Sequence, residues 1–506
     1  MRLTFLGHQS WLVENKNTAI LVDPVLDQKF GHSAELPFRI WPPRKIDTDR
    51  MPQPQAVFLS HEHLDHFHVP SLDMLPRSVQ FYTGDITPLP VVETIRKLGF
   101  TCHRIPPTES VTIGDLTVTV YPAGRETISW EKRVFQLVFS EAGVAGNDVY
   151  IPVDALASAE YAADIASGRR QAPRAAVIAN NGQVVPPGAL GAYTNLLPVP
   201  TVKRSEMTAL ELIDQLANAA QLEGLPHIEE IMVCGGGFVG PYSPHGPFQF
   251  ADHHWLASRI NELQNSRRFY GPWPGETLVL EPGAPISWDQ VPWVHLDEEE
   301  QRRGYAKLEA YLAEPKVQRI RPVMDRFDDD AEANEALQEV EEALVPLARE
   351  LLQTAVGQAA SSIHRFLDGR LGPQRCLLML LDGPGGTTHA YAWDIAAMAF
   401  VPVGDIGLGT ALRRYPYGIQ CYFRDFVAVI RGEQQIWDLA GTAMQSWYLG
   451  DSYSTMVTAF YELFGEQARP DLAARVYDRA LAAHLASKEA QRAGTSEQPE
   501  KEATVL

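Results

Sequence analysis

His61-Glu62-His63-Leu64-Asp65-His66 places three imidazoles and two carboxylates within six residues. The apolar run at 56–60 directly before it predicts a strand, so the cluster lies in the loop at the carboxyl end of that strand. His61 and His63 are two residues apart and point the same way on an extended chain, whereas Asp65 and His66 turn toward a second point. Packing alone explains such a cluster poorly, because each buried polar group needs its own hydrogen-bond partner. The stretch therefore predicts two metal ions that share nitrogen and oxygen ligands.

The composition is that of a soluble globular protein. The chain has 506 residues, 45% hydrophobic and 21% charged, with a formal net charge of -20. Such an acidic surface repels nucleic acid and anionic membranes, so we expect neither as a partner. We find no signal peptide and no apolar run long enough to span a bilayer. The cysteines are far apart and predict reduced thiols in a cytoplasmic protein: Cys102, Cys234, Cys376 and Cys421.

Composition shifts divide the chain into parts. Residues 1–280 alternate between short strands and helices and predict one domain. Three prolines and an acidic run follow, and predict a linker over 281–330. Residues 331–488 predict an α+β domain that opens with an amphipathic helix, which Pro346 should kink or divide. The polar residues 489–506 predict a disordered tail.

Three segments together resemble the metallo-β-lactamase fold: Leu6-Gly7-His8, Leu21-Val22-Asp23-Pro24 and Leu59 to His66. The resemblance covers roughly residues 1–275. It implies an α/β fold, an αββα sandwich with a two-metal site on one edge of its sheets, ahead of the helical and mixed α+β C-terminal domain.

The resemblance also implies roles for single residues. His61 and His63 would bind one metal ion, and Asp65 and His66 the other. Asp154, at the end of the strand predicted over 148–153, would bridge the two ions. Asp23 would be a buried structural carboxylate that steadies the loop, and His8 would be architectural rather than a ligand.

The sequence departs from the hydrolases of this fold at two positions. Hydrolases usually supply a third histidine in a Pro-Ala-x-His segment, but here the segment is Tyr121-Pro122-Ala123-Gly124-Arg125-Glu126. Glu126 is the nearest group able to bind a metal, although alignment on Pro-Ala puts Arg125 at the histidine position. Surface pairing of Glu126 with Arg125 is the alternative. The last histidine is replaced by Gly235-Gly236-Gly237.

These departures change the expected chemistry. A glutamate in place of a histidine adds negative charge and oxygen donation, which favours iron or manganese over zinc. A missing last histidine opens a position for dioxygen or substrate. The pattern is similar to the di-iron oxygenase branch of the fold, which includes the chloramphenicol-pathway β-hydroxylase and CMP-N-acetylneuraminate hydroxylase.

The resemblance to that branch implies a monooxygenase with two iron ions, dioxygen as co-substrate, and a small-molecule or carrier-protein-bound substrate. No flavin or nicotinamide motif is present, so electrons would come from an external donor. The alternative is a hydrolase in which two zinc or manganese ions activate water against an ester, amide or phosphodiester.

Other side chains near the expected site can be interpreted in two ways. His245 either swings in as a late ligand or lies in a loop at the mouth of the site. The adjacent His253 and His254 are more typical of a loop or helix start. Aromatic residues in the C-terminal half form core or line a pocket: Trp393, Trp437, Trp447, Tyr415, Tyr417 and Tyr448.

Overall fold

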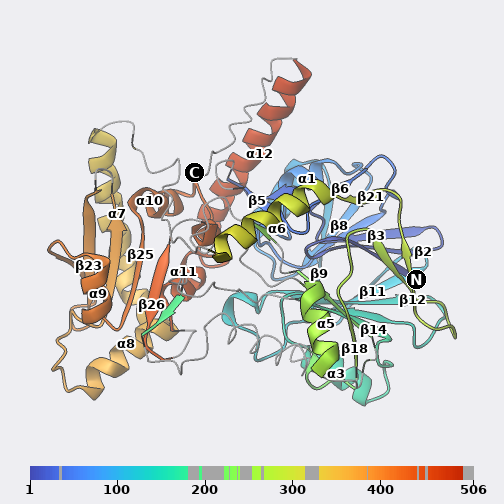
Figure 1. Ribbon diagram of the computed structural model, residues 1–506, viewed down its shortest axis with the longest axis horizontal. Helices are drawn as coiled ribbons and strands as arrows, with labels where there is room; N and C mark the ends of the chain where they lie inside the picture. Colours follow the sequence, from blue (N-terminus) through green and yellow to red (C-terminus); the bar gives the residue numbers. More distant parts are fainter. Residues whose placement is uncertain are drawn as a thin grey trace.

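The computed structural model describes residues 1–33, 37–179, 193–196, 222–226, 228, 230–235, 238–239, 253–263, 267–313, 327, 330–383, 386–441, 444–450 and 454–493. Figure 1 shows a strand-rich N-terminal domain and a C-terminal domain beside it, with helix α12 (Pro470–Arg492) between them. The sequence also predicts a helix over about 206–220, and this segment lies outside the described residues.

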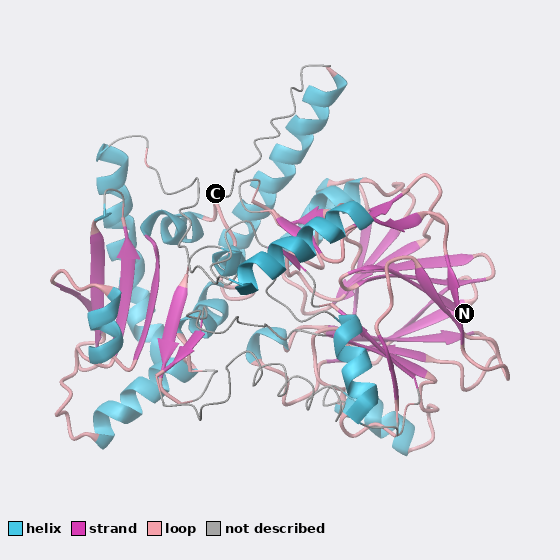
Figure 2. Cartoon of the chain, viewed as in Figure 1, coloured by secondary structure: helices cyan, strands magenta, loops and turns pink. Residues whose placement is uncertain are grey.

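Two sheets face each other in the N-terminal domain (Figure 2). In the described part of the chain the first has the order β20 (Ser287–Gln290), β19 (Glu276–Val279), β1 (Arg2–Gly7), β2 (Ser10–Asn15), β3 (Thr18–Val22), β7 (Ala56–Leu59), β8 (Gln80–Gly84) and β9 (Thr101–Ile105). The second has the order β10 (Ser110–Ile113), β11 (Leu116–Pro122), β12 (Phe135–Glu141), β13 (Val149–Ile151), β14 (Ala175–Ala179), β16 (Glu230–Cys234) and β18 (Arg268–Tyr270). Phe5 and Phe58 of one sheet share a buried core with Val120 and Phe139 of the other.

Helices cover the outer faces of this sandwich. Helices α1 (Val69–Asp73) and α2 (Leu89–Lys97) bury apolar side chains against the first sheet. Helices α3 (Ala159–Ala166) and α5 (His253–Leu263) do the same against the second. The predicted αββα arrangement is confirmed.

The first domain continues beyond its predicted boundary at residue 280. Strand β20 pairs with β19, and β21 (Val294–Leu296) pairs with β6 (Arg44–Ile46). The prolines and acidic run that predicted a linker instead mark turns between these strands and the acidic first turn of α6 (Glu298–Ala313). A further small sheet has the order β17 (Phe238–Val239), β5 (Phe38–Ile40) and β4 (Lys29–Phe30).

The C-terminal domain is a mixed sheet with helices. Its described strands have the order β15 (Tyr193–Asn195), β26 (Gln445–Tyr448), β25 (Tyr417–Tyr422), β22 (Leu377–Asp382), β23 (Thr388–Asp394) and β24 (Ala399–Val403). Its helices are α7 (Asp330–Glu350), α8 (Ala355–Phe366), α9 (Leu408–Arg414), α10 (Phe423–Arg431) and α11 (Met456–Phe464). Short 3-10 turns include η3 (Leu351–Gln353) and η5 (Ile436–Gly441).

The amphipathic helix predicted at the start of this domain is divided, but not at Pro346. That proline lies inside α7, and the break comes after Glu350. Thr354 adopts an extended conformation there and its side chain accepts a hydrogen bond from Gly357 N, which starts α8. The cap, and not the proline, sets the boundary.

Helix α12 returns to the first domain and packs against α1 and α2. Val476 and Tyr477 are buried in one core with Phe67 and Val92. Asp73 on α1 accepts from His484 Nε2 at 2.8 Å and also pairs with Lys488. Lys97 on α2 pairs with Asp478. The two domains are thus joined through a shared core and several ion pairs.

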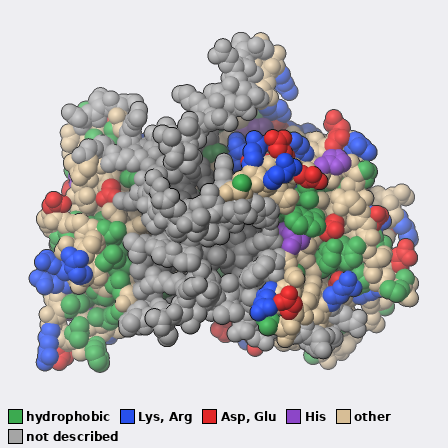
Figure 3. Space-filling model, viewed as in Figure 1, with side chains coloured by type: hydrophobic (Ala, Val, Ile, Leu, Met, Phe, Trp, Pro, Cys, Tyr) green, Lys and Arg blue, Asp and Glu red, His purple; other side chains and the backbone are tan. Residues whose placement is uncertain are grey.

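Charged side chains of both signs are interspersed over the described part of the face in Figure 3. None of the described helices combines the length and apolar composition needed to cross a bilayer.

Candidate metal centre

Asp23 organises the loop after β7. It is fully buried and has a positive φ of 44°. Its Oδ1 accepts from Ser60 N at 2.7 Å, and its Oδ2 accepts from Ser60 Oγ at 2.6 Å and from His66 Nδ1 at 2.9 Å. These bonds fix the start of the loop and one imidazole, so the predicted structural role of Asp23 is confirmed.

Asp23→Ala is expected to lower the free energy of unfolding by about 3–5 kcal/mol, because it leaves buried partners of a charged group unsatisfied. Denaturant unfolding of the metal-free protein measures this loss. The exposed Asp49 provides the control, and Asp49→Ala should change stability by less than about 0.5 kcal/mol. Equal stability of both variants would contradict the assigned role.

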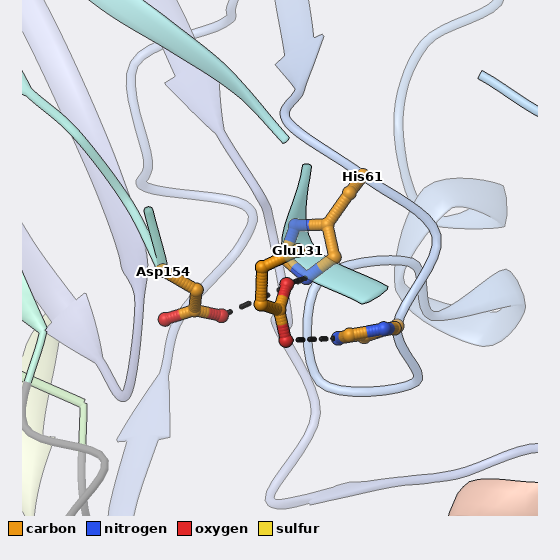
Figure 4. Close-up of side chains that lie close together, drawn as sticks. His61, Glu131 and Asp154 are labelled. Atoms are coloured by element: carbon orange, nitrogen blue, oxygen red, sulfur yellow. Dashed lines mark ion pairs between the residues drawn. The ribbon is translucent and has the colours of Figure 1, made fainter. Parts of the chain in front are cut away.

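A first group of candidate ligands gathers where β7 ends: His61, His63, Glu131 and Asp154. One donor atom from each lies within 4.8 Å of the others. Glu131 Oε2 is 3.8 Å from His61 Nε2, and Glu131 Oε1 is 3.5 Å from His63 Nδ1. Figure 4 shows Glu131 and Asp154 directed toward His61.

A second group, His8, Asp65 and His66, lies beside the first. Asp65 Oδ2 is 2.8 Å from His8 Nε2 and 3.7 Å from His66 Nε2. Asp154 connects the groups, since its Oδ2 is 3.0 Å from His66 Nε2 and 3.6 Å from His61 Nε2. Gln9 Nε2 donates to the other Asp154 oxygen at 3.0 Å. Asp154 therefore lies between the two groups, near an imidazole of each.

The donor set fits a dinuclear metal site. Among the described residues His61 Nε2 and Glu131 Oε2 are buried without a hydrogen-bond partner. Unsatisfied buried polar atoms are costly, and a metal ion would satisfy both. Imidazole nitrogens combined with carboxylates are typical ligands for zinc, iron and manganese.

The electrostatics of the site also suit cations. Burial and then the nearby His66 lower the pKa of His61 well below its usual value, so its imidazole is neutral with a lone pair available. Burial, followed by the charge of Asp154, raises the pKa of Glu131. Burial opposes protonation of His66, but the carboxylates of Asp65, Asp154 and Asp23 outweigh it and raise the pKa of His66. The neighbouring carboxylates thus raise the pKa of both Glu131 and His66, because negative charge gathered in a buried site favours a bound positive charge.

The structure brings together five of the predicted site residues, His61, His63, Asp65, His66 and Asp154. Glu126 is exposed and lies in neither group, so the carboxylate of the first group is corrected to Glu131. The 3-10 turn η1 (Ser129–Glu131) carries this side chain into the site. A carboxylate shortly before strand β12 was the available sequence signal.

His8, which the resemblance implied to be architectural, lies in the second group of candidate ligands. It follows a bulge in β1 and has a positive φ of 55°, which directs its side chain toward Asp65. Gly235 N donates to His8 O at 2.8 Å, so the glycine end of β16 lies against this turn. An imidazole therefore stands in the second group although the late histidine is missing.

Of the remaining candidate histidines, the two that the structure describes lie in neither group. His245 lies outside the described residues. His253 is buried, and its Nε2 is 2.9 Å from Pro272 O. His254 stacks on Trp273 with ring centroids 3.5 Å apart. These two contacts assign His253 and His254 to packing.

Comparisons with known proteins agree with the fold. The family model described as a β-lactamase superfamily domain matches residues 18–145. A search among curated proteins finds no match. Similar solved structures include a possible metal-dependent hydrolase from Veillonella parvula, at 15% identity over 55% of this chain and 99% of that one, with a TM-score of 0.37.

Two further structures have different activities in their names. An isothiocyanate hydrolase from Delia radicum gut bacteria is 19% identical over 55% of this chain and 99% of that one, with a TM-score of 0.37. A diiron β-hydroxylase from Streptomyces venezuelae is 14% identical over 57% of this chain and 54% of that one, with a TM-score of 0.34. The match over residues 18–145 and the two-sheet sandwich show a domain of β-lactamase fold in the N-terminal part of the chain, and its clustered donors form a candidate dinuclear metal site.

Proposed function

We propose that the protein is a di-iron monooxygenase that hydroxylates a small-molecule or carrier-bound substrate. The observation that carries the proposal is Glu131, which lies within 3.8 Å of His61 Nε2 and 3.5 Å of His63 Nδ1. The hydrolases that the sequence resembles place a histidine there. A carboxylate at this position favours a harder ion than zinc and stabilises its higher oxidation state.

Three carboxylates and four imidazoles would hold the ions: Asp65, Glu131, Asp154, His8, His61, His63 and His66. The irons, when bound, would supply the dioxygen chemistry. The protein contributes order around them, because Asp23 orients His66 and Gln9 orients Asp154. Burial of the imidazoles keeps bulk water from competing for the site.

The proposed reaction balances with a separate reductant. One oxygen atom of dioxygen enters a C–H bond of the substrate to form an alcohol, and the other leaves as water. Two electrons come from an external donor protein and two protons from solvent. A cytoplasmic location would suit both such a donor and the reduced thiols at Cys102, Cys234, Cys376 and Cys421.

A second candidate is a dinuclear zinc or manganese hydrolase. His8 favours it, because its Nε2 lies 2.8 Å from Asp65 Oδ2 and adds an imidazole to the second group. A nitrogen-richer second site would leave its ion more strongly Lewis acidic toward water.

Metal analysis of the purified protein together with its optical spectrum distinguishes the two. We expect about two irons per chain and the near-ultraviolet absorption of a ferric pair. Reduction followed by exposure to dioxygen should restore that absorption. A preparation with two zinc ions that turns over a phosphodiester or ester would contradict the oxygenase.

A further inference from the structure

We infer that the C-terminal domain positions the ligands of the first metal group, His63 and Glu131, and leaves the second group to the N-terminal domain. The inference rests on the metal site of the proposed function but not on which metal it holds. Contacts on both sides of the first group carry it.

The turn that bears Glu131 is held from the C-terminal domain. Helix α11 packs against η1, and Ser129 Oγ donates to Glu462 Oε1 across this contact. Ser129 is two residues from Glu131 on the same short turn. A 3-10 turn of this length has little stability of its own, so its position depends on what it packs against.

His63 is supported by an aromatic side chain from the same domain. The Trp437 ring in η5 lies 4.0 Å from the His63 ring, centroid to centroid. The Tyr461 ring of α11 stacks on the Trp437 ring, with centroids 4.1 Å apart. Trp437 Nε1 donates to Glu466, with both carboxylate oxygens at 3.1 Å. Trp437 is therefore fixed in place against the candidate ligand.

Arg133 joins the two domains behind His63. Its guanidinium pairs with Glu62, and its Nη2 lies 2.8 Å from His63 Nε2. The same Nη2 is 3.8 Å from Glu466 Oε2. All four of these side chains are buried, and a buried charge network of this kind is rigid because breaking it is costly.

The hydrogen bonds described for the second group come from side chains of the N-terminal domain. Asp23 holds His66 Nδ1, and His66 in turn lies against Asp65. Gln9 holds the bridging Asp154 and accepts from Cys234 Sγ at 3.0 Å. Loss of a contact from the C-terminal domain should consequently affect one ion more than the other.

The test is a cobalt(II) titration of the metal-free full-length protein, followed by its visible spectrum. The parent should bind in two phases, and His8→Ala marks the second-group phase by weakening it. Trp437→Ala and Glu462→Ala should lower the cobalt affinity of the first-group phase alone, by roughly 10–100-fold, as expected for residues that orient ligands. The spectrum of the first-group cobalt should change as well.

Two controls separate positioning from general loosening. Lys97→Ala breaks the Lys97–Asp478 pair, which also joins the domains but lies on α2 and α12, and should leave both phases unchanged. Trp437→Phe keeps an aromatic ring on His63 and should restore most of the affinity that Trp437→Ala loses. Denaturant unfolding reports whether each variant folds.

Equal weakening of both phases by Trp437→Ala and Lys97→Ala would overturn the inference, as would unchanged binding in Trp437→Ala and Glu462→Ala. If the purified protein holds zinc and hydrolyses esters, the oxygenase fails, but the selective effect on one cobalt phase still stands. The two proposals therefore fail by different results.

Discussion

Asp154→Ala is expected to reduce the metal content from about two ions per chain to well below one, and to abolish turnover. Asp154 Oδ2 lies near His61 Nε2 of one group and His66 Nε2 of the other. Its loss removes an oxygen donor from both ions, and the remaining imidazoles then lack the negative charge that offsets two cations. Elemental analysis of the purified variant and activity with the reconstituted enzyme measure the effect.

A matched control exists beside the same strand. Asp148 lies just before β13, and Asp154 lies just after it. Both carboxylates are largely buried. Asp148→Ala removes a buried carboxylate without touching the metal groups, so it should keep its metal. A metal-replete Asp154→Ala protein would show that Asp154 is not a bridging ligand.

Glu131→Ala and Glu126→Ala form the second pair of variants, and they should behave oppositely. Glu131→Ala is expected to lower the affinity for the first-group ion by more than about 100-fold. Removal of a ligand should cost more affinity than removal of a residue that only orients a ligand. Glu126→Ala should match the parent protein in metal content, because Glu126 is exposed and lies in neither group.

Metal titration of both variants decides between the two carboxylates. Glu131→Asp keeps the charge with a shorter side chain and should fall between the parent and Glu131→Ala. The opposite ranking, with metal lost from Glu126→Ala and kept in Glu131→Ala, would restore the assignment made from sequence.

The sequence was sufficient for the parts of the site that depend on local order. His61 and His63 follow a buried strand, so alternation along the chain placed them correctly. Asp154 was assigned from the resemblance, and it lies just beyond the end of β13. In both cases the residue lies within a few positions of a strand whose end is visible in the apolar pattern.

The sequence did not predict Glu131 as a candidate ligand, because the segment after β11 does not continue in an extended conformation. Gly124 N donates to Leu156 O at 2.9 Å, and a Cβ at this glycine would lie 2.4 Å from Ala157 O. This close approach bends the chain so that Glu126 faces solvent, and η1 then returns toward the site. Counting from Pro-Ala could not predict the return, because it depends on packing against residues far along the chain.

His8 and Trp437 show the same limit at longer range. His8 reaches Asp65 across 57 positions through a positive φ, and the bulge behind that conformation is not visible in hydrophobic patterning. Trp437 meets His63 only because the two domains pack together. The predicted domain boundary described the sheets approximately but carried no information about that contact.

Helix α12 also constrains the order of events during synthesis. Val476 and Tyr477 complete a core that contains Phe67 and Val92, which are made between 384 and 410 residues earlier. Domains generally fold as they emerge, N-terminal first. Part of the outer face of the sandwich therefore stays uncovered until residues 476 and 477 have been made. Apolar surface exposed in that interval favours aggregation, and the packing of α12 removes it.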